Sequence, residues 1–269
     1  MTEASSEPST RMSLLGGLTY FEYQRRICAD VVIPWVERRI RLEGLHLDDF
    51  GAHEGGMVDA LRDSGRVKSA VGLELRADIV RSSPFVSDTR FRLEIADVMA
   101  LGDASSRFDL ILLHDVLEHM PDPDAAVREI AAQARPGGWI FISFPPYYSA
   151  FGGHQQLARG RARNVPFVHL LPTSLFFRVA DPADQEYMSA ADSLADMKSV
   201  RQARLTLQRA ERAFSRAALR VVDSEFFLVR PEHTVRYGYA VRSSGALGRV
   251  PIVRECAVNG AFYLLQVPG

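Results

Sequence analysis

The stretch from Leu45 to Gly56 constrains the fold more than any other part of the chain. An apolar-rich run that ends at Phe50 is followed by three glycines within six residues, and then by a helical pattern over 57–61. A strand, a glycine turn and a helix in this order are typical of the first βα unit of a nucleotide-binding sheet. Glycine suits the turn because it adopts left-handed backbone and leaves space for a ligand.

A second βα unit supports this interpretation. Residues 67–75 have the pattern of a buried strand, and the strand ends at Glu74, which lies 19 residues beyond Gly55. A carboxylate at that strand end can accept hydrogen bonds from both hydroxyl groups of a ribose. The glycine turn and the acid together therefore predict a site for a nucleoside-containing cofactor.

Three further strands are predicted at 91–98, 108–113 and 139–144. A helix over 125–134 precedes the last of them, and Pro136-Gly137-Gly138 is expected to end that helix. Because strands alternate with helices, we expect a parallel sheet with right-handed crossovers.

Residues 1–44 are predicted to form a tail and a cap helix. Thr19 and Glu22 have the spacing of a capping box, which begins an amphipathic helix that continues to about Arg41. Pro34 predicts a kink in this helix. The helix covers the core or forms one wall of an active site.

Composition argues against several classes of protein. A net charge of −1 with 24% charged residues provides no field that attracts nucleic acid or an anionic membrane. The two cysteines form neither a disulfide framework nor a ligand cluster, which suits a reducing cytoplasm. No apolar run approaches the roughly 18 residues that span a bilayer, and a signal-peptide pattern is absent. We therefore expect a cytoplasmic protein with no nucleic-acid or membrane partner.

Residues 114–119, His-Asp-Val-Leu-Glu-His, follow the fourth strand, and Pro121 and then Pro-Gly-Gly at 136–138 come after them. With this combination the chain resembles the class I S-adenosylmethionine-dependent methyltransferases, in the small-molecule branch with the Asp-Val-Leu-Glu-His signature. The resemblance runs from about Leu45 to Phe144 and resumes at 220–230 and 260–267. It implies an α/β, Rossmann-like fold with a seven-stranded, mostly parallel sheet and an antiparallel last strand.

The resemblance also implies S-adenosyl-L-methionine as the cofactor and S-adenosyl-L-homocysteine as the product. In this family Asp49 would lie near the cofactor's amino group and Asp97 would face the adenine amino group. The expected cofactor contacts are Asp49, Gly51, His53, Gly55, Glu74, Leu75, Asp97, Val98 and His114.

His53 departs from the family's Gly-x-Gly-x-Gly pattern, in which glycine occupies the middle position. A side chain there either crowds the methionine half of the cofactor or points away from it. A degenerate, non-catalytic binding protein with the same fold is therefore an open alternative. A nicotinamide-dependent oxidoreductase is a weaker one, since dehydrogenases share the glycine turn but not the residues at 115–138.

About 75 residues between Phe144 and Arg220 leave the core pattern. We predict a lid insertion at about 146–218 within a methyltransferase domain at 45–269. The insertion is expected to cover the carboxyl ends of strands four and five, where ligands bind in open α/β sheets. Its first part is rich in aromatic residues, and 183–218 is predicted to be helical. The apolar face of this helical part contacts the sheet or a partner subunit, so a homodimer remains open.

Methyl transfer requires the acceptor and the methyl carbon to be held about 3 Å apart and in line. A hydroxyl acceptor also benefits from a base, whereas an amine needs only to arrive neutral. His154 is the first candidate for this base, because the two glycines before it let its loop fold over the site, and His114 is the second. His119 is expected to be a packing residue.

An aromatic, partly apolar pocket favours a small organic acceptor. The predicted substrate contacts are Tyr20, Tyr147, Tyr148, Phe151, His154 and His169. The seven histidines show no metal-ligand spacing, so no metal is expected. The predicted function is methylation of an oxygen or nitrogen of a small metabolite. Its assignment to specialised, natural-product biosynthesis rests on the resemblance alone.

Overall fold

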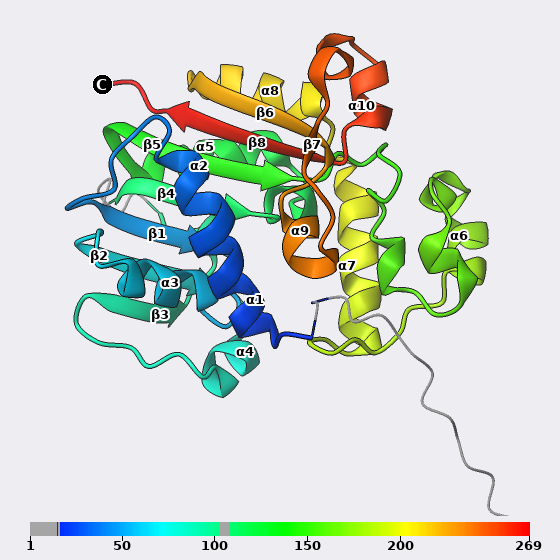
Figure 1. The fold of residues 1–269 in the computed structure, drawn as a ribbon, viewed down its shortest axis with the longest axis horizontal. Helices are drawn as coiled ribbons and strands as arrows, with labels where there is room; N and C mark the ends of the chain where they lie inside the picture. The colour runs from blue at the N-terminus through cyan, green and yellow to red at the C-terminus, as the bar shows by residue number, and fades with distance from the viewer. Residues whose placement is uncertain (1–14, 16, 103–107) are drawn as a thin grey trace, which may run out of the picture.

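The computed structural model describes residues 15, 17–102 and 108–269 (Figure 1). Within this part the chain is organised around one sheet, with the strand order β3-β2-β1-β4-β5-β8-β6-β7. Its strands are β1 (His46–Phe50), β2 (Ser69–Glu74), β3 (Phe91–Ile95), β4 (Phe108–His114), β5 (Ala134–Phe144), β6 (Arg220–Val229), β7 (Arg242–Ser243) and β8 (Gly260–Gln266).

The predicted Rossmann-like α/β fold is confirmed. Strands β1 to β5 pair in parallel, and β8 lies antiparallel to both β5 and β6. The predicted count of seven strands is wrong, because the sheet has an eighth, β7, which consists of two residues paired with the edge of β6. A pairing this short has no sequence periodicity to reveal it.

Strand β5 begins earlier than predicted. Helix α5 (Pro123–Gln133) ends before Pro136, so the Pro-Gly-Gly sequence lies inside the strand and does not end the helix. Phe108 pairs with Ala134, but Leu110 pairs with Trp139, so the extra residues form an irregularity in β5. Proline and glycine are tolerated at such a bulge because it needs fewer ladder hydrogen bonds.

Two groups of helices cover the two faces of the sheet (Figure 1). On one face pack α1 (Tyr20–Ile27), the π-helix η1 (Cys28–Val32), α2 (Ile33–Val36) and α3 (Gly56–Ser64), which share a buried core with residues of β1 and β4. On the other face, α5 and α8 (Leu207–Arg216) share a second core with the same sheet.

The N-terminal helix begins as predicted. The amide of Glu22 donates to Thr19 Oγ1 at 3.2 Å, and the amide of Thr19 donates to Glu22 Oε2 at 2.8 Å, which completes the capping box. The helix ends at Val36, short of the predicted Arg41. In place of a simple kink, the turn ahead of Pro34 widens into the π-helix η1, since proline cannot donate a backbone hydrogen bond there.

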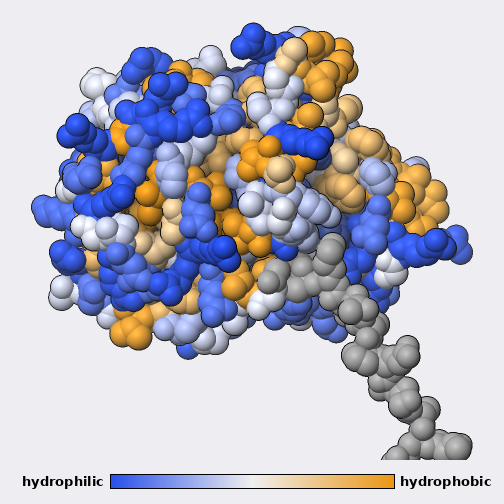
Figure 2. Space-filling view, in the orientation of Figure 1, coloured by the Kyte–Doolittle hydropathy of each residue, from blue (hydrophilic) through white to orange (hydrophobic). Residues whose placement is uncertain are grey.

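The segment between β5 and β6 packs around a small core of its own, made of Leu157, Ala158, Phe176, Ala180 and Met197. The predicted helical part is two helices, α7 (Ala190–Ala203) and α8, separated at Arg204, whose backbone is left-handed with φ 44°. Figure 2 shows hydrophobic residues on the surface at α6 (Thr173–Val179) and α10 (Val253–Ala257), in agreement with the exposed Leu175 and Val253.

The remaining elements are short. They are α4 (Ala77–Ser82), α9 (Glu232–Tyr237) and the 3-10 helices η2 (Val98–Ala100), η3 (Leu117–His119), η4 (Gln155–Leu157), η5 (Arg161–Asn164), η6 (Val168–Leu170) and η7 (Gly245–Arg249). Among the described residues, none of the helices has both the length and the apolar character that crossing a membrane requires. The domain boundaries at 44/45 and at about 146 and 218 stay predictions.

Candidate active site

The glycine turn lies between β1 and α3, at the carboxyl edge of the parallel strands. Gly51 has a φ of 76°, and a Cβ on it would lie 2.7 Å from Val116 Cγ2. Gly55, the residue before α3, has a φ of 78°. Both positions therefore require glycine, for backbone conformation and, at Gly51, for space. Gly56 serves packing instead, because a Cβ there would collide with the Phe21 carbonyl of α1.

His53 has a left-handed backbone, with φ 51°, at the position where the family pattern has glycine. Its ring lies against Tyr20, with 4.3 Å between centroids, and Tyr20 stacks on Tyr187 at 4.8 Å. The side chain is thus turned toward the cap helix. Burial lowers the pKa of His53 to about 4, with Arg76 acting in the same direction, so the ring is neutral at pH 7.

Glu74 ends β2 with its carboxylate held toward the turn. Oε2 accepts the amide N–H of His53 at 2.9 Å, and Oε1 accepts the amide N–H of Arg76 at 2.8 Å. A carboxylate has further lone pairs, so two backbone donors orient it without saturating it. The next residue, Leu75, is 66% exposed.

Asp49 lies in β1 just before the turn and is 2% exposed. Its Oδ2 has no hydrogen-bond partner among the described residues. Burial raises the pKa of Asp49 to about 7, and the nearby His114 opposes part of that effect. A buried carboxyl group with an unused oxygen favours a cationic partner.

Asp97 lies beyond the end of β3 and is exposed. Its Oδ1 accepts the amide N–H of Met99 at 2.8 Å, which caps the short helix η2. Val98 is half-buried against the second core. The adenine contacts expected of these two residues stay predictions.

His114 ends β4 inside a buried cluster of charges. Its Nε2 lies 3.1 Å from Glu232 Oε1, and Arg230 Nη2 donates to the same carboxylate oxygen at 2.7 Å. Arg230 Nη2 also lies 2.6 and 2.7 Å from the two carboxylate oxygens of Asp115. Burial alone would lower the pKa of His114, but Asp115 and Glu232 outweigh it and raise that pKa. His114 is therefore biased toward its protonated form.

The sequence reasoning missed Arg230 and Glu232. Arg230 ends the segment 220–230, where the resemblance resumes, and Glu232 lies two residues beyond it. Glu74 likewise ends the second strand, so the rule that singled out Glu74 could have found them. Strand β6 is antiparallel to β8, which is antiparallel to β5, so β6 ends at the same edge of the sheet as β5.

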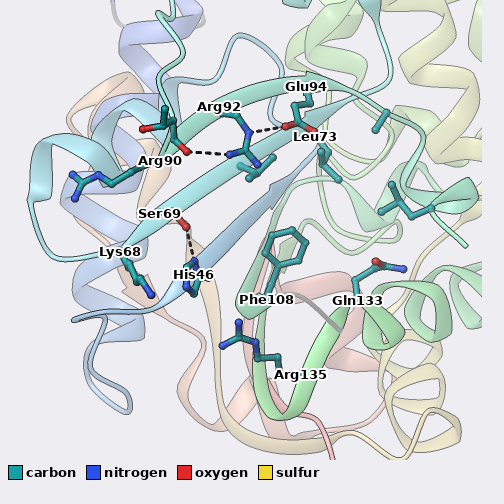
Figure 3. A pocket seen from close by; sticks show the side chains of 14 residues that line it. His46, Lys68, Ser69, Leu73, Arg90, Arg92, Glu94, Phe108, Gln133 and Arg135 are labelled. Carbon is teal, nitrogen blue, oxygen red and sulfur yellow. Dashed lines mark hydrogen bonds and ion pairs between the residues drawn. The ribbon is translucent and has the colours of Figure 1, made fainter. Parts of the chain in front are cut away.

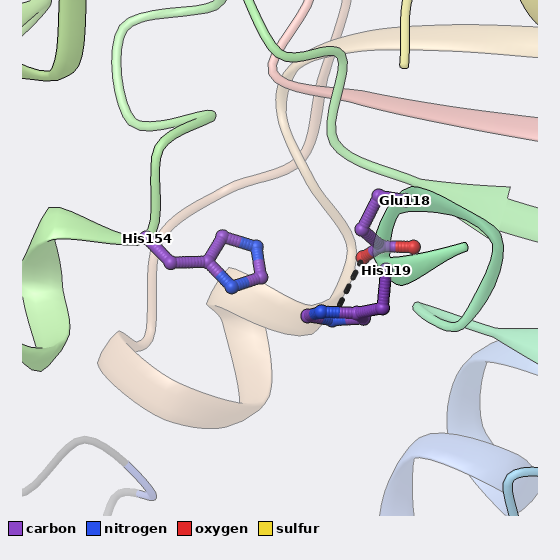
Figure 4. A group of neighbouring side chains, drawn as sticks. All are labelled: Glu118, His119 and His154. Carbon is purple, nitrogen blue, oxygen red and sulfur yellow. Dashed lines mark ion pairs between the residues drawn. The ribbon is translucent and has the colours of Figure 1, made fainter. Parts of the chain in front are cut away.

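His154 belongs to a second cluster, next to η3. Its Nδ1 lies 2.6 Å from Oδ1 of Asp196 in α7. Its ring meets that of His119 edge to face, with 5.2 Å between centroids, and Glu118 lies beside them (Figure 4). Asp196 was also missed, and no local pattern in the sequence marks it. The pKa values of Glu118, His119 and Asp196 all respond to Asp115, so the two clusters share one region.

The predicted substrate residues divide into two groups. Tyr147 and His169 are buried, and His169 Nε2 donates to the Tyr147 carbonyl at 2.7 Å. His169 also explains Gly153, because a Cβ on that glycine would collide with the His169 side chain. Tyr148 and Phe151 are 37% and 40% exposed, and Tyr20 contacts His53 as described. The structure thus places Tyr147 and His169 within the packing of the insertion.

A hollow of about 670 Å³ lies elsewhere, on the face of β2 and β3 (Figure 3). Its lining includes His46, Lys68 and Arg135, which lie at the amino ends of strands. Ligands of open α/β sheets bind at the opposite, carboxyl ends, so this hollow is not the candidate active site.

Comparison with solved structures shows the same fold. The plantazolicin methyltransferase BpumL in complex with SAH aligns with a TM-score of 0.56 at 10% identity, covering 93% of this chain and 86% of that one. An S-adenosylmethionine-dependent methyltransferase from Mesorhizobium loti aligns with a TM-score of 0.52 at 15% identity, covering 87% and 96%.

Among curated proteins, a ubiquinone biosynthesis O-methyltransferase from Coxiella burnetii is 30% identical over 114 residues. The match covers 42% of this chain and 49% of the relative, so the chain spans about half the length of the curated relatives it matches. The sequence model of the methyltransferase domain family matches residues 20–184, more than half of the chain. The chain therefore belongs to the methyltransferase domain family, and it shares its fold with the S-adenosylmethionine-dependent methyltransferase and the plantazolicin methyltransferase above, as the resemblance predicted.

Proposed function

We propose that the protein transfers the methyl group of S-adenosylmethionine to an oxygen or nitrogen of a small organic molecule. The observation that carries the proposal is the hydrogen-bonded pair of His154 and Asp196, 2.6 Å apart, in the region of the carboxyl ends of the parallel strands. An imidazole oriented by a carboxylate is the usual form of a general base.

The residues at the glycine turn fit the cofactor. Asp49 has a buried oxygen without a hydrogen-bond partner, which suits the cofactor's ammonium group. Gly51 brings bare backbone to the site, and Glu74 is held in place by two backbone amides while it keeps free lone pairs for ribose hydroxyls. When bound, the cofactor supplies an activated methyl group on a sulfonium, which needs no acid.

His154 is a better candidate for the base than His114. Asp196 accepts the proton on Nδ1 of His154, which leaves Nε2 as the nitrogen that can take a proton. The Nε2 of His114 is paired with Glu232, and Asp115 and Glu232 raise the pKa of His114, which disfavours the neutral form that accepts a proton. A base is useful only for a hydroxyl acceptor, so this arrangement favours an oxygen acceptor.

The acceptor is assigned by chemical class. The matched curated relative is named an O-methyltransferase, in support of an oxygen acceptor, but the match covers half of its length. A role in natural-product biosynthesis is part of our proposal, supported only by the fold shared with the plantazolicin methyltransferase. The expectations of a cytoplasmic protein, of a homodimer, and of no nucleic-acid or membrane partner stay predictions.

A non-catalytic binding protein is the second candidate function, and His53 favours it. Its side chain occupies the turn where the family has glycine, and its amide uses one oxygen of Glu74. The same fold occurs in SpnF, a [4+2]-cyclase, with a TM-score of 0.50 at 15% identity. Membership of the fold does not by itself specify methyl transfer.

Two measurements on the purified protein test the proposal. Calorimetry with S-adenosylmethionine should show binding, and incubation with a panel of small phenols, alcohols and amines should show S-adenosylhomocysteine formed only with an acceptor. Binding without turnover across the panel would favour the non-catalytic candidate. If the protein shows no heat of binding and no thermal shift at millimolar cofactor, the methyl-transfer proposal is overturned and the non-catalytic candidate is favoured.

A further inference from the structure

Three groups that accept hydrogen bonds or metal ions face one another next to η3, and the proposed base, His154, is one of them. Figure 4 shows Glu118 and His119, from η3, with their side chains turned toward His154, from the loop after β5. One ligand atom from each of the three lies within 4.8 Å of the other two. The sequence predicted no metal because its histidines lack ligand spacing, but these groups come from two distant segments that only the fold brings together.

Glu118 has no partner that would offset its burial. The residue is 3% exposed, and neither carboxylate oxygen has a hydrogen-bond partner among the described residues. The nearest histidine nitrogen, Nε2 of His119, lies 3.9 Å from Oε1, which is too long for a hydrogen bond. A carboxylate buried in this way is unfavourable unless a cation or a proton neutralises it.

The hydrogen bonds around His119 leave its Nε2 as a free acceptor. Ser199 donates its hydroxyl proton to the Asp196 carbonyl at 2.7 Å, so the Ser199 oxygen accepts the proton on Nδ1 of His119 at 2.8 Å. In the neutral ring, Nε2 then carries a lone pair. That nitrogen lies 3.8 Å from Asp196 Oδ2, in addition to its distance from Glu118.

His154 has the same arrangement. Its Nδ1 donates to Asp196 Oδ1 at 2.6 Å, which leaves Nε2 with a lone pair. A histidine that binds a metal through one nitrogen usually donates from the other to a carboxylate, because this holds the ring and raises its basicity. Among the described residues, the cluster thus offers two imidazole acceptors and one carboxylate.

We propose that Glu118, His119 and His154 bind one divalent transition-metal ion, with Asp196 as the positioning residue for His154. Two imidazoles and one carboxylate with an open position form a donor set of catalytic zinc sites and of non-haem iron sites. Bond lengths of about 2.0–2.2 Å place such ligand atoms roughly 3–4 Å apart, so small side-chain movements suffice.

Metal binding itself is independent of the proposed function. Only the role of the bound ion rests on the proposed function. At the open position, the ion would acidify an acceptor hydroxyl, and His154 would then be a ligand and not the base. The site would thereby restrict the acceptor to molecules with an oxygen that can coordinate the ion.

The test is metal binding to the full chain after treatment with a chelator. Titration with Co²⁺ should give visible d–d absorption bands that saturate near one equivalent, and Zn²⁺ should displace them and raise the melting temperature. Glu118→Gln, His119→Asn and His154→Asn should each weaken Co²⁺ binding by roughly 100-fold or more, and Asp196→Asn by about 10–100-fold. His46→Asn, at the far end of β1, is the matched histidine control and should bind as the unaltered protein does.

Several outcomes would overturn the proposal. One is the absence of saturable Co²⁺ absorption. Another is a Co²⁺ affinity in Glu118→Gln equal to that of the unaltered protein. A third is a loss of Co²⁺ affinity in His46→Asn as large as the losses in the three ligand variants. A Glu118→Gln protein that is more stable than the original, with no response to Zn²⁺ in either, would show that Glu118 is neutralised by a proton. Circular dichroism checks that each variant is folded, and the three ligand variants are independent tests. No methyl transfer is measured, so failure of the proposed function would leave the metal result intact.

Discussion

The imidazole Nδ1 of His154 lies 2.6 Å from the carboxylate Oδ1 of Asp196, although 42 residues separate them in the chain. The loop after β5 supplies the histidine and α7 supplies the acid, so the packing of the insertion sets this contact. The contact uses Nδ1 and leaves Nε2 as the other nitrogen of the ring, in a cluster with Glu118 and His119 (Figure 4).

His154→Ala should lower kcat by roughly 100-fold or more for a hydroxyl acceptor and leave cofactor affinity unchanged, because the group that activates the hydroxyl, as a base or as a ligand of the ion, is lost while the cofactor site is intact. Steady-state kinetics and calorimetry measure the two effects, with His46→Ala as the control. For an amine acceptor the loss should be smaller and appear mainly in KM. Normal turnover in both His154→Ala and His114→Ala would remove the base from the mechanism.

Glu74→Ala should weaken cofactor binding by about 2 kcal/mol, since two ribose hydroxyls lose a charged acceptor. The amide of His53 also loses its partner, so the turn should become less ordered. Calorimetry gives the affinity, and Glu94→Ala, an exposed acid on the neighbouring β3, is the control. Equal affinities in the two variants would place the ribose elsewhere.

Cofactor affinity should rise by about 10-fold between pH 6 and pH 7.5, because the pKa of Asp49 near 7 in the free protein keeps the group mostly protonated at the lower pH. Only the carboxylate can pair with the ammonium group of the cofactor. Asp49→Asn should bind weakly and lose this pH dependence. A pH-independent affinity in the unaltered protein would contradict the placement of the ammonium group at Asp49.

The same pKa shift predicts a stability effect in the free protein. The folded pKa of Asp49 lies above the ordinary carboxyl value, so the folded state holds a proton that the unfolded state releases between about pH 4 and pH 7. The contribution of this group to stability therefore falls as the pH rises through that window. Asp49→Asn should melt at a higher temperature than the original at pH 8, and the gap should shrink at pH 5.

At position 53, glycine should be more stable than alanine by about 1 kcal/mol. The backbone φ of 51° strains any residue with a Cβ but not glycine, while both variants lose the contact with Tyr20. Thermal unfolding of His53→Gly and His53→Ala makes the comparison. If His53→Ala unfolds at the same temperature as His53→Gly or at a higher one, the turn relaxes out of the left-handed region in the alanine variant. Cofactor affinity of the glycine variant then measures how far His53 restricts the site.

Many features of the candidate cofactor site were predictable from local patterns in the sequence. Apolar runs that alternate with helical segments indicate a parallel sheet, and a glycine turn that precedes an acid at the next strand end indicates a nucleoside site. Thr19 and Glu22 lie three residues apart, so their capping box is visible in the sequence and is present in the structure. Each of these signals depends on residues that are close along the chain.

The remaining features depend on contacts between distant segments. Arg230 meets Asp115 across 115 residues, and His114 meets Glu232 across 118, because β4 and β6 end at one edge of the same sheet. Neighbouring carboxylates, and not residue type, separate the two histidines: Asp115 and Glu232 raise the pKa of His114 against the effect of burial, whereas burial lowers the pKa of His53 to about 4. The sequence alone thus determined most of the strands and the glycine turn. Only the tertiary structure decided which charges pair and which acceptors face one another, since these depend on distances that chain order does not encode.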